Sequence, residues 1–521
     1  MLTHTDSGFK ISEENMSHFM YMDDIKLISN TQNGLNKLIR TTEEFSNDIR
    51  MNFGLEKCKT NHMKRGKWCQ SDDFILLEES GGGTVRSMDK HETYKYLKFI
   101  QSQGINGSEM KNQIKNTFKT RLNAVMKTQL CGSNKVQATN TFVMPTITYS
   151  FGIIKWTPTE LDEQNRSVRT TYTKYRSHHP KACKERFHLP RDIGGRGVMD
   201  LRLQHKKQIK NLRTYFHTIA STSSLYDTIS KTDKKLTPLN LSDKEMDIDA
   251  DYTIALQKSK WQGKELHGRY LNTLDLDSIH KPASLAWLTH GTIFPETEGF
   301  MCPIQDQVIA TRSYLKYIIK DPTIKTTVCR MCGEGNENIE HIISSCTTLA
   351  SREYTDRHNN VAKIIHTELS LKYKCINERI PYYNYVPMNV LENEACKLYW
   401  DREILTDRTV QHNRPDICLL DKLKKEIYLI DIAVPAPTNV NRKHQEKIDK
   451  YILLAQDMKE VWGVDKVSVV PIVIGSTGEI PKQLLHNLKK LELNQNLYIQ
   501  LQKSVILATC NIMRKVLNLR R

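Results

Sequence analysis

The stretch Glu426-Ile427-Tyr428-Leu429-Ile430-Asp431-Ile432-Ala433-Val434 decides how the C-terminal part of the chain is interpreted. Its nearly continuous apolar run predicts a buried strand. One carboxylate, that of Asp431, interrupts the run. An ionised carboxylate in such a place is costly unless something pairs with it. We therefore expect Asp431 to have a partner.

A second acid, Asp416, ends the turn Arg414-Pro415-Asp416 and opens the neighbouring predicted strand, residues 417–420. If the two strands pair, both carboxylates converge at one edge of the sheet. Two carboxylates can hold Mg²⁺, which takes oxygen ligands and keeps several waters. The ion would activate a water and stabilise charge on a scissile phosphate. The alternative is structural: an arginine–aspartate pair and a cap-like aspartate.

A site that cleaves a phosphodiester in this way also needs a cation. Two positions after Asp431 stands Ala433, so the usual lysine is absent there. Lys447 borders the inner face of the helix that follows, and we expect it to position the water or to stabilise the charge of the phosphate. Lys450 is the second candidate for this role. Glu394 could orient the metal, although a structural role is favoured for it.

The elements around these acids alternate between helix and strand. They are predicted as helix 389–404, strand 414–420, strand 426–434, helix 441–460, strand 466–474 and helices to the end. Such alternation predicts an α/β domain with a central mixed sheet.

A metal-ligand pattern, Cys329-x2-Cys332-x8-His341-x4-Cys346, precedes this domain. Thiolates and an imidazole suit Zn²⁺, and four of them close a tetrahedron. The zinc would be structural, because no position stays open for a substrate. The alternative is a chance cluster of buried cysteines.

Basic and aromatic residues follow the metal pattern. We expect Arg352 and Arg357 to contact phosphates and Tyr354 to stack on unpaired bases. The alternative for each is a solvated surface side chain.

A third pattern, Tyr21-Met22-Asp23-Asp24, lies between two short strand-like segments, 16–21 and 25–28. Asp23 and Asp24 at such a turn could hold the two metal ions of a polymerase, since in-line phosphoryl transfer uses two such charges. The alternative is a solvated turn.

Composition narrows the class of protein. The chain has 521 residues and a net charge of +17, from 76 basic and 59 acidic residues. Its length predicts three or four domains, and the charge favours a polyanionic partner. No apolar run is long enough for a membrane span, and the N-terminus has no signal-peptide core. With scattered cysteines, these features predict a nuclear or cytoplasmic protein that is not secreted.

The string Phe19-Met20-Tyr21-Met22-Asp23-Asp24-Ile25-Lys26-Leu27, with Gly54-Leu55-x-Lys57-Cys58, resembles the back half of a reverse-transcriptase palm. The whole chain resembles the C-terminal part of the Pol protein of non-LTR retrotransposons that carry a restriction-like endonuclease. Further support comes from the stretches Leu189-Pro190…Gly194-Gly195-Arg196-Gly197 and Trp287-Leu288…Glu296-x-Glu298-Gly299.

The resemblance implies a multidomain α+β and α/β protein. Its parts would be a partial palm (1–105), a helical thumb-like region (106–220), a mostly helical linker (221–322), a zinc knuckle with its following helix (323–375) and a restriction-like endonuclease (388–521).

The family activity is target-primed reverse transcription. The endonuclease nicks DNA and the polymerase copies element RNA from the freed 3′ end, using dNTPs. By position, Asp23 and Asp24 match the palm acids, Asp416 and Asp431 match the nuclease acids, and the knuckle ligands match the zinc site.

The departures from the family also matter. The fingers and a further palm aspartate are not encoded, so we expect no autonomous polymerase activity. Lys98 stands where the family usually has glycine. We interpret the chain as a truncated element copy, or as a gene model that starts at an internal methionine. The alternatives are an RNA- or DNA-binding remnant without catalysis and a decayed copy with no cellular role.

Overall fold

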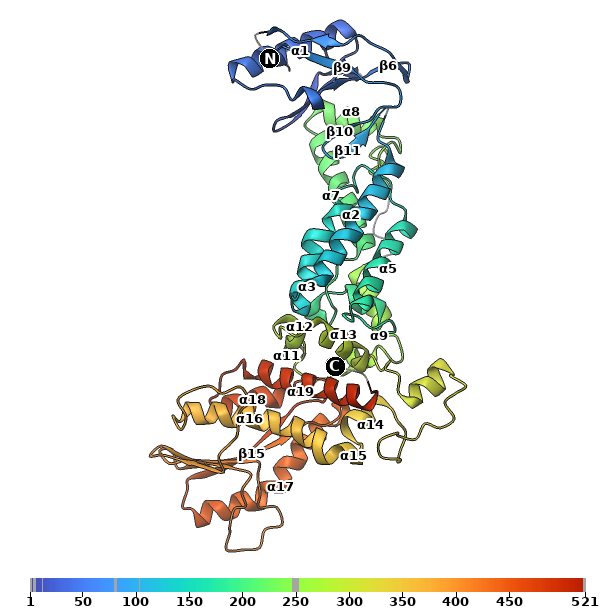
Figure 1. Ribbon diagram of the computed structural model, residues 1–521. Helices are drawn as coiled ribbons and strands as arrows, with labels where there is room; N and C mark the ends of the chain where they lie inside the picture. Colours follow the sequence, from blue (N-terminus) through green and yellow to red (C-terminus); the bar gives the residue numbers. More distant parts are fainter. Residues whose placement is uncertain are drawn as a thin grey trace. The chain divides into compact units, whose positions relative to one another are not determined.

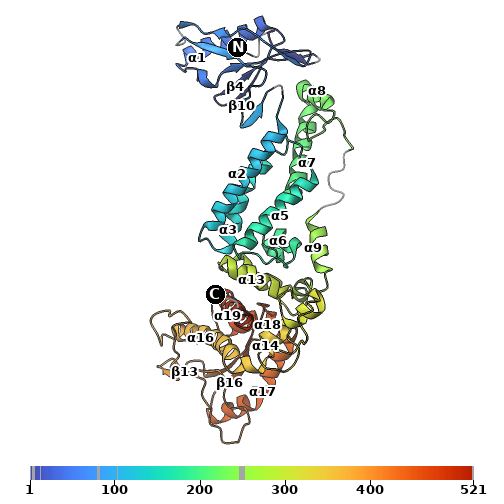
Figure 2. The ribbon, with the colours of Figure 1, turned by 45° about the vertical axis from the view of Figure 1, so that its right-hand side comes forward.

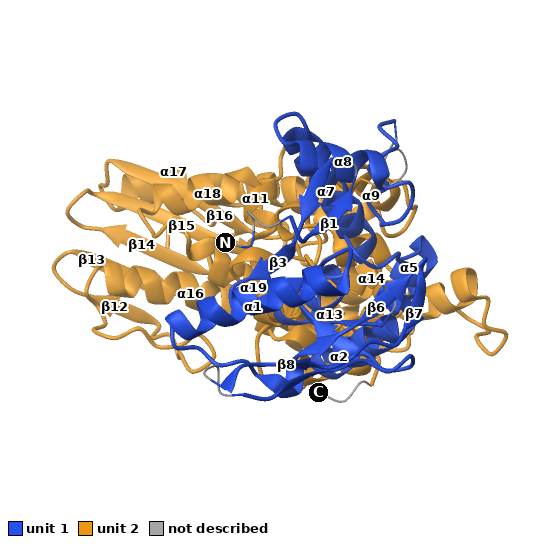
Figure 3. Ribbon diagram, turned by 90° about the horizontal axis from the view of Figure 1, so that it is seen from above, with its two compact units in different colours: residues 1–122, 142–164, 201–251 blue, residues 123–141, 165–200, 252–521 orange. Residues whose placement is uncertain are grey.

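The computed structural model describes residues 2, 6–11, 13–78, 82–102, 104–245 and 253–518. Its mixture of helices and several sheets confirms the mixed α+β class. The chain divides into two compact units, each built from separate segments (Figure 3). Unit 1 comprises residues 1–122, 142–164 and 201–251, and unit 2 comprises residues 123–141, 165–200 and 252–521. The finer five-part division stays a prediction.

Unit 1 opens with short strands around one long helix, α1 (Gln32–Asp48). The helix begins at Thr31, whose side chain accepts a hydrogen bond from the Gly34 amide and so caps the first turn. Ile39 on its buried side packs into a small apolar cluster with Phe74. The strands are β1 (Phe9–Ile11), β2 (Glu14–Met16), β3 (His18–Tyr21), β4 (Asp24–Leu27), β5 (Lys59–Thr60), β6 (His62–Lys64), β7 (Lys67–Cys69), β8 (Phe74–Ile75), β9 (Thr84–Ser87), β10 (Tyr94–Tyr96) and β11 (Phe99–Gln101).

Two tight hairpins in unit 1 show how the turns are made. Strands β3 and β4 pair antiparallel, as the sequence predicts for the segments around Asp23. Strands β10 and β11 pair through Leu97 and Lys98, whose φ angles are +46° and +66°. This left-handed backbone favours glycine, and other residues adopt it at a cost of about 1 kcal/mol. Leu97 and Lys98 therefore strain this turn.

The middle of the chain is helical, as predicted. The helices are α2 (Gly107–Lys127), α3 (Gly132–Ala138), α4 (Pro145–Thr148), α5 (Pro158–Lys174), α6 (Lys184–His188), α7 (Leu201–Ala220), α8 (Ser224–Thr232), α9 (Ile254–Gln262), α10 (Arg269–Leu274), α11 (Lys281–Ser284), α12 (Ala286–Thr289) and α13 (Pro295–Gln305). The predicted linker, 221–322, contains α8 to α13, and its residues 246–252 lie outside the described ones.

Two of the stretches that carry the family resemblance bind each other inside unit 2. Arg191 and Arg196 both form ion pairs with the buried Glu298 of α13. Burial would raise the pKa of Glu298, but the two guanidinium groups outweigh it and lower that pKa. Gly195 lies so close to the Leu189 carbonyl that a Cβ there would clash at 1.9 Å. The Gly-Gly pair is thus needed for the close turn that brings both arginines to one carboxylate.

The C-terminal half of unit 2 holds a five-stranded sheet in the order β12-β13-β14-β15-β16. The strands β12 to β15 are antiparallel to their neighbours, and β16 is parallel to β15. The strands are β12 (Val390–Glu392), β13 (Cys396–Trp400), β14 (Ile417–Asp421), β15 (Glu426–Ala433) and β16 (Lys466–Val473), and the helices are α14 (Ile339–Ser344), α15 (Thr347–Leu349), α16 (Thr355–Lys372), α17 (Val440–Val461), α18 (Lys482–Lys490) and α19 (Leu497–Val516).

Helices cover both faces of this sheet. Side chains of β15 alternate between the faces. Ile430 and Ile432 pack with α16, α18 and α19, whereas Ile427 and Leu429 pack with α17 (Figure 1 and Figure 2). By the same alternation Asp431 belongs to the α17 face.

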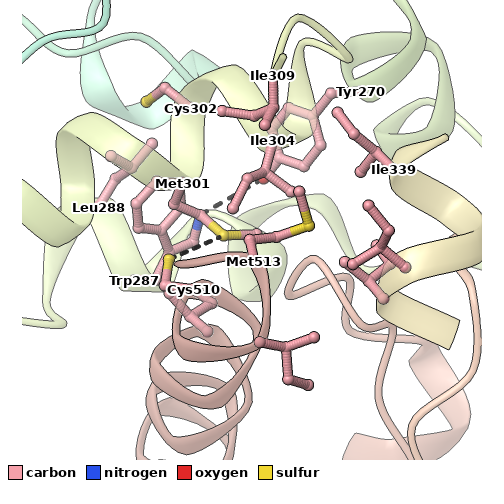
Figure 4. Close-up of a cluster of buried hydrophobic side chains, with 14 of the residues drawn as sticks. Tyr270, Trp287, Leu288, Met301, Cys302, Ile304, Ile309, Ile339, Cys510 and Met513 are labelled. Atoms are coloured by element: carbon pink, nitrogen blue, oxygen red, sulfur yellow. Dashed lines mark hydrogen bonds between the residues drawn. The ribbon is translucent and has the colours of Figure 1, made fainter. Parts of the chain in front are cut away.

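A second core joins α19 to the helices that precede the knuckle (Figure 4). Trp287, Met301 and Met513 are at most 1% exposed. Cys510 Sγ lies 3.8 Å from Met301 Sδ. Each such side chain contributes about 2 kcal/mol by burial, so this core holds α13, α14 and α19 as one body.

The predicted helix 389–404 is wrong. This segment forms the hairpin β12–β13 at the edge of the sheet, with Glu394 in its turn. The other predicted strands and helices of this part are present, with ends shifted by up to three residues. None of the described helices combines the length and the apolar character that a membrane crossing requires.

Candidate active site and metal centre

Asp431 lies on the face of the sheet that α17 covers, and its side chain is 2% exposed. Tyr451 of α17 donates a hydrogen bond of 2.7 Å to its Oδ1. Lys447, one helical turn earlier, forms an ion pair with Oδ2, although Oδ2 receives no regular hydrogen bond from the described residues. Lys450 Nζ lies 3.7 Å from Oδ1. The buried carboxylate therefore has the partners that its burial requires, and all of them come from α17.

Asp416 immediately precedes β14. The β14–β15 ladder begins with Ile417, which pairs with Ile430, the residue before Asp431. Asp416 Oδ2 accepts a hydrogen bond of 2.6 Å from the Ile432 amide. The two predicted acids thus come together at one end of two neighbouring strands.

His358 of α16 also holds Asp416. Its Nε2 donates to Asp416 Oδ2 at 3.0 Å. Burial would raise the pKa of Asp416, but His358, the Ile432 amide and the charge of Lys447 outweigh it and lower that pKa. In turn, burial would lower the pKa of His358, but the hydrogen bond and charge of Asp416 raise it. Each group therefore favours the charged form of the other.

Tyr451 is a site residue that the sequence did not single out. It is fully buried, and its hydroxyl lies 2.9 Å from the Arg414 carbonyl as well as beside Asp431. Burial first, and then the charge and hydrogen bond of Asp431, raise its pKa. The phenol stays protonated and can only steer Asp431. Its position one turn after Lys447 is the signal that could have identified it.

The remaining predictions around this site have mixed outcomes. Glu394 is exposed in the hairpin turn beside Cys396, which pairs with Asp421 at the far end of β14 from Asp416. It cannot orient an ion between the two acids. Arg414 forms a two-pronged ion pair with Asp401, at 2.8 Å for both bonds, rather than with either site acid.

A hollow of about 530 Å³ opens beside α17. Two of its lining residues, Lys447 and Lys450, also contact Asp431, and Lys443 and His412 extend the basic lining. Glu446 and Asp449 line it as well. Lys447 and Lys450 therefore connect the buried acid to a concave surface with more positive than negative side chains.

The predicted zinc ligands also come together. The ligand atoms of Cys329, Cys332, His341 and Cys346 all lie within 4.8 Å of one another. Cys329 Sγ is 4.0 Å from Cys346 Sγ, and Cys332 Sγ is 3.4 Å from His341 Nε2. A zinc tetrahedron requires about 3.8 Å and about 3.5 Å for these edges, given its bond lengths. The cluster could hold one zinc ion.

Local structure explains how the knuckle forms. Gly333 and Gly335 have φ angles of +71° and +61°, which the tight turn after Cys332 requires. Asn338 caps α14 by accepting a hydrogen bond of 2.7 Å from the His341 amide. Cys346 is buried in the same core as α19. Cys329 and Cys346 are buried, and Cys332 and His341 are half-buried. Four protein ligands around one ion would leave no position open for a substrate.

Two of the three predicted nucleic-acid contacts have protein partners in the structure. Arg357 is 2% exposed and donates to Thr509 Oγ1 at 3.0 Å and to the Ile343 carbonyl at 2.8 Å. Burial lowers its pKa to about 10. The Tyr354 hydroxyl donates to the Ile342 carbonyl at 2.6 Å and accepts from the Cys346 amide. Both side chains fasten the knuckle to the rest of unit 2.

Arg352 is exposed, which leaves it accessible to phosphates. Asp23 and Asp24 are also exposed, at the turn between β3 and β4. Within the described part of the chain, the knuckle is the only group of three or more side chains that could hold a metal ion. No third ligand therefore joins Asp23 and Asp24 there.

A scan against protein-family models finds no match for the chain, and a search of curated proteins finds none either.

Proposed function

We propose that unit 2 carries a Mg²⁺-dependent DNA endonuclease site, in a piece of a non-LTR retrotransposon reverse transcriptase and endonuclease. One observation carries this proposal: the Asp416 carboxylate, just before β14, binds the amide of Ile432 next to Asp431, whose own carboxylate pairs with the Lys447 ammonium. Two carboxylates and one cation at one end of two neighbouring strands are what metal-assisted phosphodiester hydrolysis needs. The finer assignments, a restriction-like endonuclease at 388–521 and a partial palm at 1–105, belong to the same proposal.

The residues present fit Mg²⁺, because both acids offer the hard oxygen ligands that it prefers. When bound, the ion supplies charge to lower the pKa of a water and to stabilise the phosphate. Hydrolysis forms a bond from the water oxygen to phosphorus and breaks the bond to the leaving oxygen, which takes up a proton. Lys447 lies where it can steady the phosphate charge, and Tyr451 holds Asp431 in place.

The hollow beside α17 is our proposed path for the DNA backbone. Lys443, Lys447 and Lys450 line it, and lysine side chains neutralise phosphates without regard to sequence. The partners of this protein would be target DNA and, by resemblance, element RNA. We propose that the palm-like part does not polymerise in this chain, because Asp23 and Asp24 find no further carboxylate among the described residues.

Nicking of supercoiled plasmid tests the proposal. The zinc-loaded full chain is expected to convert supercoiled plasmid to the open circle with Mg²⁺, and Asp431→Ala is expected to abolish this. EDTA followed by excess Mg²⁺ and Zn²⁺ should restore the wild-type reaction. Absence of nicking by the wild type, or nicking that survives Asp431→Ala, would contradict the endonuclease.

A non-catalytic binding protein is the second candidate, and one observation favours it. Both oxygens of Asp431 already contact protein groups, Tyr451 and Lys447, as in a structural ion pair. The same plasmid assay separates the two candidates. Retention of DNA on a gel without nicking, unchanged by Asp431→Ala, supports the binding protein.

A further inference from the structure

The Asp416 carboxylate is anchored through one oxygen. Its Oδ2 accepts two hydrogen bonds, from the Ile432 amide at 2.6 Å and from His358 Nε2 at 3.0 Å. No hydrogen bond or ion pair reaches its Oδ1 from any residue that the structure describes. One oxygen is thus fixed by the protein, and the other is left for a ligand.

His358 comes from the face of the sheet opposite to α17. It lies in the first turn of α16, and the neighbouring Arg357 ties this turn to the Ile343 carbonyl and to Thr509. Its Nδ1 lies 3.1 Å from Asn359 Oδ1. Both ring nitrogens are therefore engaged, and the imidazole has no free nitrogen with which to ligate a metal ion itself.

We propose that His358 is a positioning residue of the metal site. By holding Oδ2, it fixes the rotamer of Asp416 so that Oδ1 is presented to an ion shared with Asp431. This inference rests on the proposed endonuclease. The physical reason is that a ligating carboxylate loses affinity when it can rotate, and loss of such an outer hydrogen bond typically weakens metal binding about 10-fold to 100-fold.

The sequence did not indicate this role. His358 follows the metal pattern at a distance that suggests a surface phosphate contact, and the acid that it holds is 58 residues further along the chain. Only the packing of α16 across β14 and β15 brings the two together.

Calorimetric titration of Mg²⁺ into the zinc-loaded full chain tests the inference without using activity. His358→Ala and His358→Leu remove the donor, and having both guards against one failing to fold. We expect each to bind Mg²⁺ about 10-fold to 100-fold more weakly than the wild type. His358→Gln keeps an N–H of similar reach and should recover most of the affinity. His486→Ala, an exposed histidine on α18, is the matched control and should bind as the wild type does.

Plasmid nicking at several Mg²⁺ concentrations is the second readout. The donor-less variants should need more Mg²⁺ for half-maximal nicking and approach the wild-type rate at saturation. Unchanged Mg²⁺ affinity in His358→Ala or His358→Leu overturns the inference, while nicking that still depends on Asp431 leaves the endonuclease standing. A wild type with no Asp431-dependent Mg²⁺ binding overturns both. Thermal unfolding of each variant shows which of them retain the fold.

Discussion

The chain carries two pairs of acids, and their surroundings differ. Asp23 and Asp24 are consecutive residues on a hairpin turn, both exposed, and within the described residues neither carboxylate accepts a hydrogen bond or pairs with a cation. Asp416 and Asp431 lie 15 positions apart in the sequence, but the Asp416 carboxylate binds the Ile432 amide beside Asp431, and four side chains from two helices contact the two acids.

The difference teaches what turns acids into a site. Asp23 and Asp24 are close because they are adjacent in the sequence, but no side-chain contact among the described residues orients their carboxylates. Asp431 is costly to bury, so it remains there only because Lys447 and Tyr451 compensate. A buried acid with oriented partners is a candidate for a functional site. The following predictions test that contrast.

The largest effect is expected from neutralising one acid of each pair. Asp431→Asn should slow plasmid nicking about 1,000-fold, because metal-assisted charge stabilisation is worth several kcal/mol. Asp24→Asn should leave nicking unchanged. The single-turnover rate at saturating Mg²⁺ measures both. Equal losses in the two variants would mean that the contrast drawn above is wrong.

Removal of the zinc should affect unit 2 and spare unit 1. Cys346→Ser deletes a ligand inside the core that contains α19, and we expect unit 2 to lose about 3 kcal/mol or more of unfolding free energy. Cys69→Ser, in unit 1, is the control. Zinc per chain by mass spectrometry and denaturant unfolding provide the readouts. Full zinc occupancy in Cys346→Ser would rule out the proposed ligand set.

Lys447→Ala should weaken both the chemistry and the fold. Loss of the charge beside Asp431 should slow nicking about 100-fold. The carboxylate left without its ammonium should lower the unfolding free energy by about 2 kcal/mol. Lys459→Ala, exposed on the same helix, is the control. If Lys450→Ala has the larger effect on nicking, then that lysine, the second candidate, is the functional one.

Two histidines of α16 are expected to affect stability in opposite ways as the pH changes. His366 is fully buried against Tyr385, and burial lowers its pKa to about 4. Its contribution to stability is present above about pH 6.5 and is lost as pH falls towards 4, about 2 kcal/mol between pH 7 and pH 5. His358 has a raised pKa, so its contribution is present below about pH 6.5 and is lost as pH rises through the raised value.

Urea unfolding at pH 5 and pH 7 measures this. His366→Gln should reduce the loss of stability at pH 5, whereas His358→Gln should not. An identical pH dependence in all three proteins would show that neither histidine titrates as its surroundings require.

The sequence predicted the secondary structure correctly where a single hydrophobic period dominates a segment. The apolar run around Asp431 could only be a buried strand, and the helical spacing of α17 placed Lys447 at its edge. It failed at 389–404, where Leu391, Ala395 and Leu398 fit a helical period while Cys396, Leu398 and Trp400 fit a strand. Pairing with β14 decided for the strand, and that partner lies about twenty residues away.

The roles of Arg357 and His358 could not be predicted for a similar reason. The groups that Arg357 binds are residues 343 and 509, and the acid that His358 binds is residue 416. Local sequence shows a basic, aromatic segment after a metal pattern, which is typical of a nucleic-acid contact. In the structure, Arg357 and His358 instead bind groups that are distant in the sequence.

The smallest expected effect separates the exposed arginine from the buried one. Arg352→Ala should weaken DNA binding only a few-fold and reduce the slope of log affinity against log salt by about 1, as for a single phosphate contact. Arg357→Met should leave that slope unchanged and lower the unfolding temperature instead, because the Thr509 hydroxyl and the Ile343 carbonyl lose a buried donor. Binding titrations at four salt concentrations, with thermal unfolding of the same samples, provide both numbers. A reduced salt slope in the Arg357 variant would mean that this guanidinium reaches DNA after all, and that α16 moves when DNA binds.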